Sequence, residues 1–318
     1  MKPLFMWAGG KNKMLEKYQP HLPENFSNYV EPFFGGGAMF IWAYQKNPNA
    51  SFVINDINEH IIGIYEAVKN DCDKFLEKMD ELQSIYLPLA GPNSIDTNKE
   101  LQKKHKMKER GRYDWLKIYN EEPSRRHFYF SLRDEYAFEY SKWNKTEEAA
   151  VLYFLMKTGF NGVWQLNANT NGRFGTPCGL LNQKDAVYDK KNVLLWKKAL
   201  QNTTICCGDF KNTLSHVNED TYVFLDPPYR GSFADYGTKS DDEFQEEVID
   251  FLNDCKNKGA YGLLSNRHIG DNFFLDRLKD NVLKYFDVTY TAGRRKKTEN
   301  GFEAKKAVEI LMITHEKE

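Results

Sequence analysis

Seven short apolar runs, lying towards the two ends of the chain, constrain its fold more than any other feature. They are residues 27–31, 51–56, 203–207, 221–226, 260–266, 284–290 and 307–314. The apolar residues in these runs are continuous rather than alternating, which is typical of strands that are covered on both faces. Stretches with helical periodicity separate several of the runs. Strands that alternate with helices predict a doubly wound, Rossmann-like α/β sheet.

The stretch 240–259 is the clearest of the expected helices. Ser240 and Glu243 predict a capping box at its start, and Gly259 predicts its end. One face of this helix carries its apolar residues, which are Phe244, Val248, Phe251 and Cys255.

The middle of the chain has a different pattern. Residues 59–158 show helical periodicity without a clear strand. The dipeptides Asn161-Gly162 and Asn171-Gly172 predict turns, and the second indicates a β-hairpin. A two-stranded ribbon fits the major groove of DNA, although an ordinary surface hairpin would have the same residues. We therefore expect a catalytic domain made of residues 1–56 and 187–318, and an inserted, mainly helical domain at 57–186.

Composition excludes several other classes of protein. The formal net charge of the 318 residues is −1, so any nucleic-acid surface must be a local patch. The five cysteines are odd in number and form no C-x-x-C, and the histidines form no metal-binding pattern, so we expect neither a disulfide framework nor a metal site. No apolar run approaches 18 residues, and we expect a cytoplasmic protein that does not enter a membrane.

Acidic residues follow three of the predicted strands. Glu31 precedes a glycine-rich turn, which lets a ligand approach the backbone closely, although a plain tight turn would look the same. Asp56 stands where a carboxylate can accept both hydroxyls of a ribose, and Asp209 stands beside Phe210, a pair suited to an adenine. The carboxyl ends of parallel strands share one edge of a sheet, so these residues favour a cofactor that contains adenosine.

The fourth strand ends in Asp226-Pro227-Pro228-Tyr229, which suits a base with an exocyclic amino group. The lone pair of such an amine is delocalised into the ring, which makes the nitrogen a poor nucleophile. The Asp226 carboxylate and the Pro227 carbonyl can each accept one N–H, and this favours a tetrahedral nitrogen. The prolines stiffen the backbone, and Tyr229 offers a ring for stacking.

This tetrapeptide is the D-P-P-Y signature of amino-group DNA methyltransferases, which use S-adenosylmethionine. Trp7-Ala8-Gly9-Gly10-Lys11, then Glu31-Pro32-Phe33-Phe34-Gly35-Gly36-Gly37 and Asn55-Asp56 precede it, in the order found in Dam-type N6-adenine methyltransferases. The chain resembles the α-group of that family, in which the target-recognition insertion precedes D-P-P-Y. The resemblance implies a seven-stranded methyltransferase sheet and a target-recognition, DNA-binding role for residues 57–186.

The resemblance also implies roles for single residues. Asp226, Pro227 and Tyr229 would hold a target adenine that is flipped out of double-stranded DNA. Residues expected to contact S-adenosylmethionine are Trp7, Lys11, Phe33, Gly35, Gly37, Asp56, Asp209, Phe210 and Asp226. Residues expected to contact DNA are Asn161, Gly162, Gln165, Arg173, Arg125, Arg126, Arg295 and Lys296.

Two positions depart from the Dam pattern and leave the recognition sequence open. Met6 stands where a base-contacting lysine is common, and Gln165 stands where an arginine usually reads a guanine. Glutamine prefers adenine and arginine prefers guanine, so GATC and related sites both remain candidates.

The expected activity is methylation of adenine N6 in double-stranded DNA by a monomer or weak dimer, in the cytoplasm of a bacterial or phage-infected cell. Restriction-modification, phage evasion and gene regulation are all compatible with it. Other activities also remain open: methylation of RNA adenine or of cytosine N4, and a catalytically silent protein that only recognises a DNA site.

Overall fold

The computed structural model describes residues 1–7, 9–91, 104–105, 113–231, 241–290, 296–298, 301–303 and 305–315. Its contacts divide the chain into two compact units. We call them the helical unit, which is Met1–Gly9 with Gly63–Gln201, and the sheet unit, which is Gly10–Ile62 with Asn202–Glu318. Within the described residues, no helix combines the length and the apolarity that crossing a membrane requires.

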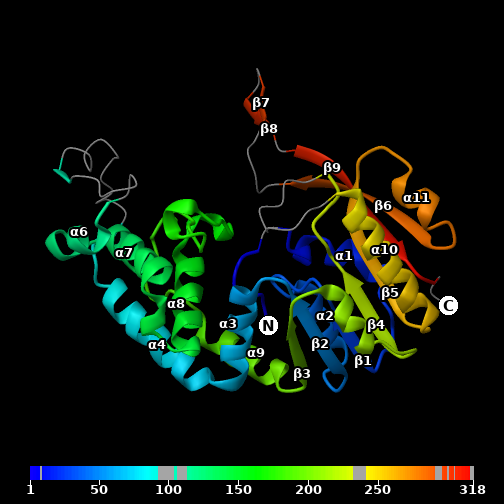
Figure 1. Ribbon diagram of the computed structural model, residues 1–318, viewed down its shortest axis with the longest axis horizontal. Coiled ribbons are helices and arrows are strands. Elements are labelled where there is room, and N and C mark those ends of the chain that lie inside the picture. The colour runs from blue at the N-terminus through cyan, green and yellow to red at the C-terminus, as the bar shows by residue number, and fades with distance from the viewer. Residues whose placement is uncertain are drawn as a thin grey trace. The chain divides into compact units, whose positions relative to one another are not determined.

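The sheet unit contains a seven-stranded sheet with the order β3-β2-β1-β4-β5-β9-β6 (Figure 1). Its strands are β1 (Asn28–Glu31), β2 (Ser51–Asp56), β3 (Thr203–Cys207), β4 (Thr221–Leu225), β5 (Tyr261–His268), β6 (Val282–Tyr290) and β9 (Lys305–Ile313). Strands β3, β2, β1, β4 and β5 are parallel, whereas β9 runs antiparallel between β5 and β6. The predicted doubly wound, seven-stranded α/β fold is therefore confirmed. Strands β7 (Lys296–Thr298) and β8 (Gly301–Glu303) form a separate antiparallel pair.

The strand order creates a switch point between β1 and β4. The chain passes from β1 outward to β2 and β3, and it then returns to β4 on the other side of β1. In the register of this pair Val30 lies opposite Val223, so Glu31 and the residues after Leu225 lie at the same edge. Ligands of open α/β sheets bind at the carboxyl ends of the strands beside such a point.

Short and long helices precede or connect these strands. They are η1 (Lys11–Lys13), α1 (Leu15–Tyr18), η2 (Gln19–His21), α2 (Ala38–Lys46), η8 (Phe210–His216), α10 (Asp242–Asn257) and α11 (Phe273–Arg277). The cap of α10 differs from the prediction. Asp241 accepts the Phe244 N–H, so the helix is capped one residue after Ser240, which lies outside the described residues. Gly259 follows the helix with φ of 83°, a left-handed conformation that glycine adopts without strain.

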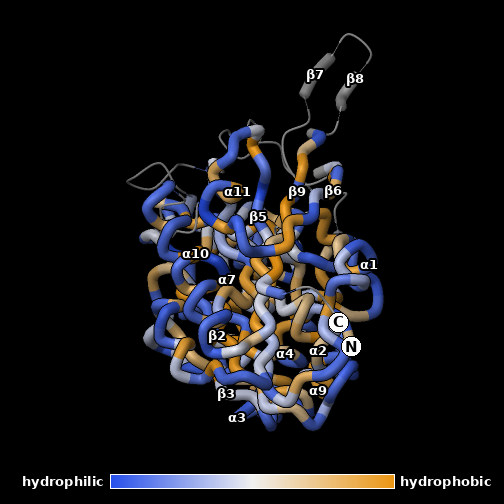
Figure 2. Tube along the Cα trace, turned by 90° about the vertical axis from the view of Figure 1, so that its right-hand side faces the viewer, coloured by the Kyte–Doolittle hydropathy of each residue, from blue (hydrophilic) through white to orange (hydrophobic). Residues whose placement is uncertain are grey.

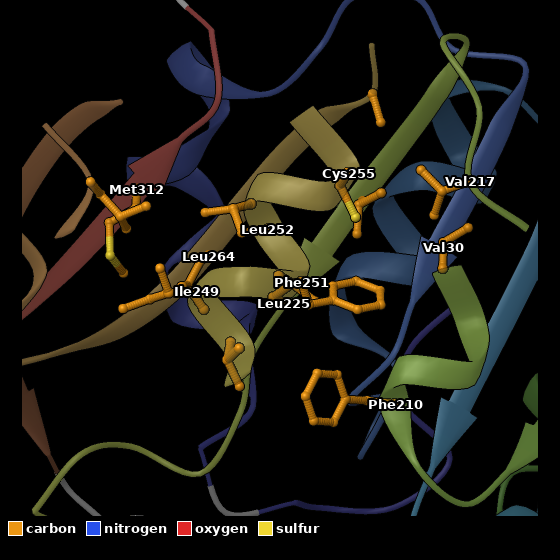
Figure 3. Packing of buried hydrophobic residues seen from close by; sticks show 14 of the residues in the cluster. Val30, Phe210, Val217, Leu225, Ile249, Phe251, Leu252, Cys255, Leu264 and Met312 are labelled. Atoms are coloured by element: carbon orange, nitrogen blue, oxygen red, sulfur yellow. The ribbon is translucent and has the colours of Figure 1, made fainter. Parts of the chain in front are cut away.

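The core of the sheet unit includes the apolar face of α10. Val248, Phe251 and Cys255 are buried, and Phe244 packs against them, as the periodicity predicts. Figure 3 shows Phe251 and Cys255 among side chains of the sheet that include Leu225. Strand β9 contributes four buried apolar residues in a row, Ile310–Ile313, and Figure 2 shows it as a hydrophobic stretch.

The helical unit consists mainly of α3 (Glu59–Asn70, whose first turn belongs to the sheet unit), α4 (Cys72–Tyr86), α6 (Trp115–Glu121), α7 (Arg125–Phe138), α8 (Lys145–Thr158) and α9 (Lys190–Leu200). Its 3-10 turns are η5 (Tyr140–Lys142), η6 (Phe160–Gly162) and η7 (Ala168–Thr170). Helix α8 is buried from Ala149 to Met156 and begins with a capping box between Asn144 and Glu147.

The helical unit includes two segments that we expected in the catalytic domain. They are residues 1–9 and 187–201. The Lys2 carbonyl accepts hydrogen bonds from Asn192 and from the Trp196 indole. These bonds fasten the N-terminal segment to α9.

Both Asn-Gly dipeptides form turns. Asn161 and Gly162 have φ of 50° and 62°, and Asn171 and Gly172 have φ of 56° and 73°. The legs of the predicted hairpin meet at two isolated antiparallel bridges, Leu166 with Phe174 and Gly159 with Cys178. The hairpin is thus present as a loop with two bridges rather than as a regular ribbon.

Candidate active site in the sheet unit

An ion pair lies at the carboxyl end of β4. Lys11 Nζ is 2.7 Å from both carboxylate oxygens of Asp226, and the two side chains are 4% and 20% exposed. Burial raises the pKa of Asp226, and the Lys11 ammonium opposes this rise. Burial disfavours the charged form of Lys11, but Asp226 and the other acidic neighbours outweigh it and raise the Lys11 pKa. The lysine therefore remains a cation next to the Asp226 carboxylate.

Tyr229 lies next to this ion pair. The Lys11 ammonium is 4.8 Å from the centre of the Tyr229 ring, a cation–π distance. The Tyr229 hydroxyl lies 3.0 Å from Ser265 Oγ on β5, and Ser265 Oγ is 2.8 Å from the Tyr18 hydroxyl. Tyr18 donates in turn to Glu309 Oε2 on β9 at 3.0 Å.

Sequence reasoning did not single out Ser265, Tyr18 or Glu309. Ser265 and Glu309 interrupt two otherwise apolar runs, and that interruption was the available signal. A polar residue in a buried strand requires a hydrogen-bonding partner, which implies a cluster.

Two buried amides hold the backbone of the D-P-P-Y segment. Gln245 Nε2 donates to the Pro228 carbonyl at 2.9 Å, and Asn266 Nδ2 donates to Gln245 Oε1 at 2.8 Å. Asn266 Oδ1 also accepts the Arg230 N–H at 3.1 Å. Both amide residues are fully buried. The proline rings restrict the φ angles of this segment, and the hydrogen bonds from Gln245 on α10 and Asn266 on β5 hold its backbone in place.

The glycine turn after β1 is fastened to the end of β2. Asp56 accepts the N–H of Gly35 at 2.8 Å and that of Asn58 at 2.9 Å. Burial raises the Asp56 pKa, and these backbone N–H groups oppose the rise. Gly35 and Gly37 have φ of 49° and 67°, so side chains there would be strained. The turn therefore brings bare backbone to the switch point.

Asn55 joins the ends of three strands. Its side-chain amide donates to the Pro32 and Gly208 carbonyls, at 3.0 Å in both cases. Pro32 follows β1, and Gly208 follows β3. This buried amide positions the two loops on either side of β2.

Phe33 and Phe210 lie together, with ring centroids 4.9 Å apart. Phe210 is only 7% exposed and belongs to the core (Figure 3), so Phe33 offers more open ring surface. Asp209 is exposed and accepts the Lys211 N–H as the cap of η8. An adenine-binding role for Phe210 thus depends on the small part of its ring that the core leaves uncovered.

Trp7, the remaining residue expected to contact the cofactor, belongs to the helical unit. Its ring packs 6.0 Å from the rings of both Phe5 and Trp164.

Arg125, one of the residues expected to contact DNA, is buried in the helical unit and joins backbone segments there. Its guanidinium donates to the carbonyls of Leu87, Leu181 and Gln183 at 2.7–2.9 Å, and the residue is 9% exposed. A DNA contact by Arg125 would therefore have to compete with these three hydrogen bonds inside the protein.

Other arginines near the hairpin also have internal contacts. Arg173 pairs with Glu148, and its guanidinium lies 3.8 Å from the centre of the Tyr140 ring. Arg126 is partly buried and lies over the Phe130 ring at 5.5 Å. A DNA contact by Arg173 would have to compete with these intramolecular contacts.

Asn161, Gly162 and Met6 are among the residues that line a pocket of about 210 Å³ in the helical unit. Asn161 is exposed, as is Gln165 further along the loop. Arg295 and the side chain of Lys296 lie outside the part of the chain that the structure describes. Among the described residues, no group of three or more His, Cys, Asp or Glu side chains could hold a metal ion.

The doubly wound sheet carries this polar cluster at its switch point, where α/β proteins of this class bind their ligands. A family model described as D12 class N6 adenine-specific DNA methyltransferase matches residues 7–295, and the chain belongs to this family. It is an adenine-specific DNA methyltransferase, and DNA is its substrate.

Curated relatives agree with this assignment. The type II methyltransferase M.MjaIII of Methanocaldococcus jannaschii is 30% identical over 86% of either chain. The retron Ec67 DNA adenine methylase of Escherichia coli is 25% identical, over 99% of this chain and 92% of the relative. The DNA adenine methylase of Escherichia coli strain K12 is 23% identical, over 96% of this chain and 93% of the relative.

Proposed function

We propose that this enzyme transfers the methyl group of S-adenosylmethionine to N6 of an adenine that is flipped out of double-stranded DNA. The observation that carries the proposal is the Lys11–Asp226 pair beside Tyr229 at the switch point of the sheet. The family establishes the reaction class, and the proposal concerns the methyl donor, the duplex substrate and the residues that act.

The sheet unit has residues that fit S-adenosylmethionine. Gly35 and Gly37 present backbone without a Cβ atom, and both have left-handed conformations that suit glycine. Phe33 offers a partly open ring, and Asp56 and Asp209 end adjacent strands with carboxylates. When bound, the cofactor supplies a methyl group on a positively charged sulfur.

Asp226 prepares the target nitrogen. An ionised carboxylate accepts hydrogen bonds only, and Lys11 favours that form. Asp226 then accepts one N–H of the adenine amino group, and the Pro227 carbonyl accepts the other. As the nitrogen gains the methyl group it gives up one proton, and the Asp226 carboxylate, which already accepts this N–H, would receive it. Positioning and electrostatics supply the rate without a covalent enzyme intermediate.

Tyr229 supplies the stacking surface for the flipped adenine. Its ring is partly exposed, and its hydroxyl is held through Ser265. On the DNA side, the exposed Asn161 and Gln165 are the best-placed of the expected contacts. The recognition sequence stays open between GATC and related sites. We infer a monomer or weak dimer, and we expect it to act in the cytoplasm of a bacterial or phage-infected cell.

Asp226→Asn tests the proposal, because it keeps the size of the side chain and removes its charge. The full chain is incubated with S-adenosylmethionine labelled in the methyl group and with unmethylated duplex DNA of mixed sequence, and the product nucleosides are separated. We expect N6-methyladenine from the wild type and a loss of about 100-fold or more in kcat for Asp226→Asn, with cofactor affinity nearly unchanged. Asp220→Asn, a change at an exposed acid on the same segment, should be as active as the wild type.

Three outcomes would contradict the proposal. Label found in N4-methylcytosine, or only in RNA offered in place of DNA, would assign a different substrate. Specific DNA binding without any methyl transfer would indicate a silent recognition protein. Unchanged turnover in Asp226→Asn would remove Asp226 from the reaction.

A further inference from the structure

A hydrogen-bonded chain of side chains leads from Tyr229 into the interior of the sheet unit. It passes from Tyr229 to Ser265, then to Tyr18 and finally to Glu309, with oxygen–oxygen distances of 3.0, 2.8 and 3.0 Å. Ser265 and Tyr18 are fully buried, and Glu309 is 3% exposed. The three inner residues come from β5, α1 and β9, and none of them is among the residues expected to contact the adenine or the cofactor.

The inner end of this chain sets the direction of its hydrogen bonds. Tyr18 donates its single hydroxyl proton to Glu309. Ser265 must then donate to Tyr18, because each hydroxyl carries one proton. The Tyr229 hydroxyl has two acceptors for its proton, Ser265 Oγ at 3.0 Å and the Asp226 carboxylate, to which it is also hydrogen-bonded. A phenolic O–H prefers the plane of its ring. A carboxylate on β9 therefore restrains the ring of Tyr229, two hydroxyls away.

Charge couples the same chain to Lys11. Burial opposes the ammonium form of Lys11, whereas Asp226, Tyr18 and Glu309 favour it. Burial also raises the pKa of Tyr18 well above its ordinary value, so this hydroxyl keeps its proton at neutral pH. Lys11 contacts the Tyr229 ring from one direction, and the hydroxyl chain holds its polar end.

We infer that Glu309 is a positioning residue for methyl transfer: acting through Tyr18 and Ser265, it fixes the ring on which the target adenine stacks. The inference rests on the proposed function. Tyr18 and Ser265 are neutral hydroxyls, so removing either one leaves the charges beside Lys11 in place. Loss of either hydroxyl should therefore lower kcat with little change in the affinity for S-adenosylmethionine.

Tyr18→Phe and Ser265→Ala test the inference, because each breaks the chain at one hydroxyl. We expect either change to lower kcat about 10-fold, since small misplacements of a reacting group cost this much or more. In a Tyr229→Phe background, which has no hydroxyl to position, Tyr18→Phe should have less than about a twofold further effect. Glu309→Gln can still accept from Tyr18, so it should retain more activity than Glu309→Ala.

Tyr261→Phe is the matched control. Tyr261 lies on β5 like Ser265, and its hydroxyl donates to the His21 backbone carbonyl at 3.0 Å. This change removes a tyrosine hydrogen bond of similar length from the same strand. It should affect thermal stability only and leave kcat at the wild-type value.

Wild-type kcat in Tyr18→Phe and Ser265→Ala would overturn the inference. The inference would also be overturned if Tyr18→Phe lowered kcat by the same factor in the Tyr229→Phe background as in the wild type. That result would indicate general damage to the fold. A crystal structure of Ser265→Ala gives a readout that does not depend on activity. A displaced Tyr229 ring would support the inference, and an unmoved ring would overturn it even if the wild type transfers no methyl group, a result that would separately refute the proposed function.

Discussion

Glu31 shows how burial at the carboxyl edge of the sheet changes the pKa of an acidic residue. The residue is 3% exposed and accepts the Tyr29 hydroxyl at 2.7 Å. Burial raises its pKa well above the ordinary value of 4.5, and the charges of Asp226 and Asp56 add to the rise against the hydrogen bond from Tyr29. The folded protein therefore binds this proton more tightly than the unfolded chain does. Ionisation of Glu31 lowers stability as the pH rises above about 4.5, up to the pKa of the folded state.

Glu31→Gln should consequently stabilise the protein in a pH-dependent way. Glutamine resembles the neutral acid and can still accept from Tyr29. We expect the Tm of the variant to exceed that of the wild type by about 2–4 °C or more at pH 8, and the difference to vanish near pH 4. Thermal unfolding followed by circular dichroism across this range measures it. The exposed Glu16→Gln should show no such trend, and a Glu31 variant that is less stable at every pH would contradict the argument.

The two Asn-Gly turns show how one dipeptide can have different consequences in different elements. A Cβ at Gly162 would lie 2.2 Å from the Met6 Cβ and 2.9 Å from the Met6 carbonyl oxygen, whereas a Cβ at Gly172 would meet nothing within 4 Å. Both glycines have positive φ. The turn at Gly162 is thus a packing contact as well as a turn, and it supports the position of Met6.

Gly162→Ala and Gly172→Ala form a matched pair of variants. Both should lose about 1–2 kcal/mol through backbone strain, because alanine is disfavoured in the left-handed region. Gly162→Ala should lose clearly more, since Met6 and its backbone must shift as well. Urea unfolding compares the two stabilities. Equal losses would show that the contact with Met6 contributes nothing.

Much of each element was predictable from the sequence, and the exceptions have physical causes. The strands of the sheet lie close to their predicted ranges. The inner strands β1 and β4 are apolar because both of their faces are buried, whereas the edge strands β3 and β6 are partly exposed. The cap of α10 lies at Asp241 rather than Ser240, because serine and aspartate are both good caps and the pattern does not choose between them. Arg125 was expected to contact DNA, and the carbonyls to which it donates come from segments distant in the sequence, Leu87 and Leu181 among them.

The candidate site was predictable in part for a similar reason. Asp226 and Tyr229 stand in a contiguous motif, and Lys11 belongs to a second motif. Ser265 and Glu309 stand alone in strands, and only the sheet order brings them near Tyr229. The partners of isolated polar residues such as these can be identified only after the order of the strands is known.

At the scale of the whole molecule, the sheet depends on β9. This strand lies between β5 and β6 and pairs with both, so its loss would leave two edges without partners. It also buries a run of apolar side chains, Ile310–Ile313.

Removing residues 305–318 should therefore prevent the sheet unit from folding. We expect proteases to cleave the shortened chain at sites within residues 10–62 and within residues 202–304. We also expect it to have no methyl-transfer activity. Limited proteolysis with mass spectrometry locates the cleavage sites. A shortened chain that unfolds cooperatively at the wild-type Tm would contradict this dependence.

The place of β9 also has a consequence for biosynthesis. Glu309 reaches Tyr18 across 291 positions of sequence, and its strand enters between two strands that the ribosome has already released. A chain still being translated holds neither a closed sheet nor a complete support behind Tyr229. The closed sheet and the complete support behind Tyr229 therefore form at the same stage, after residue 313 has left the ribosome.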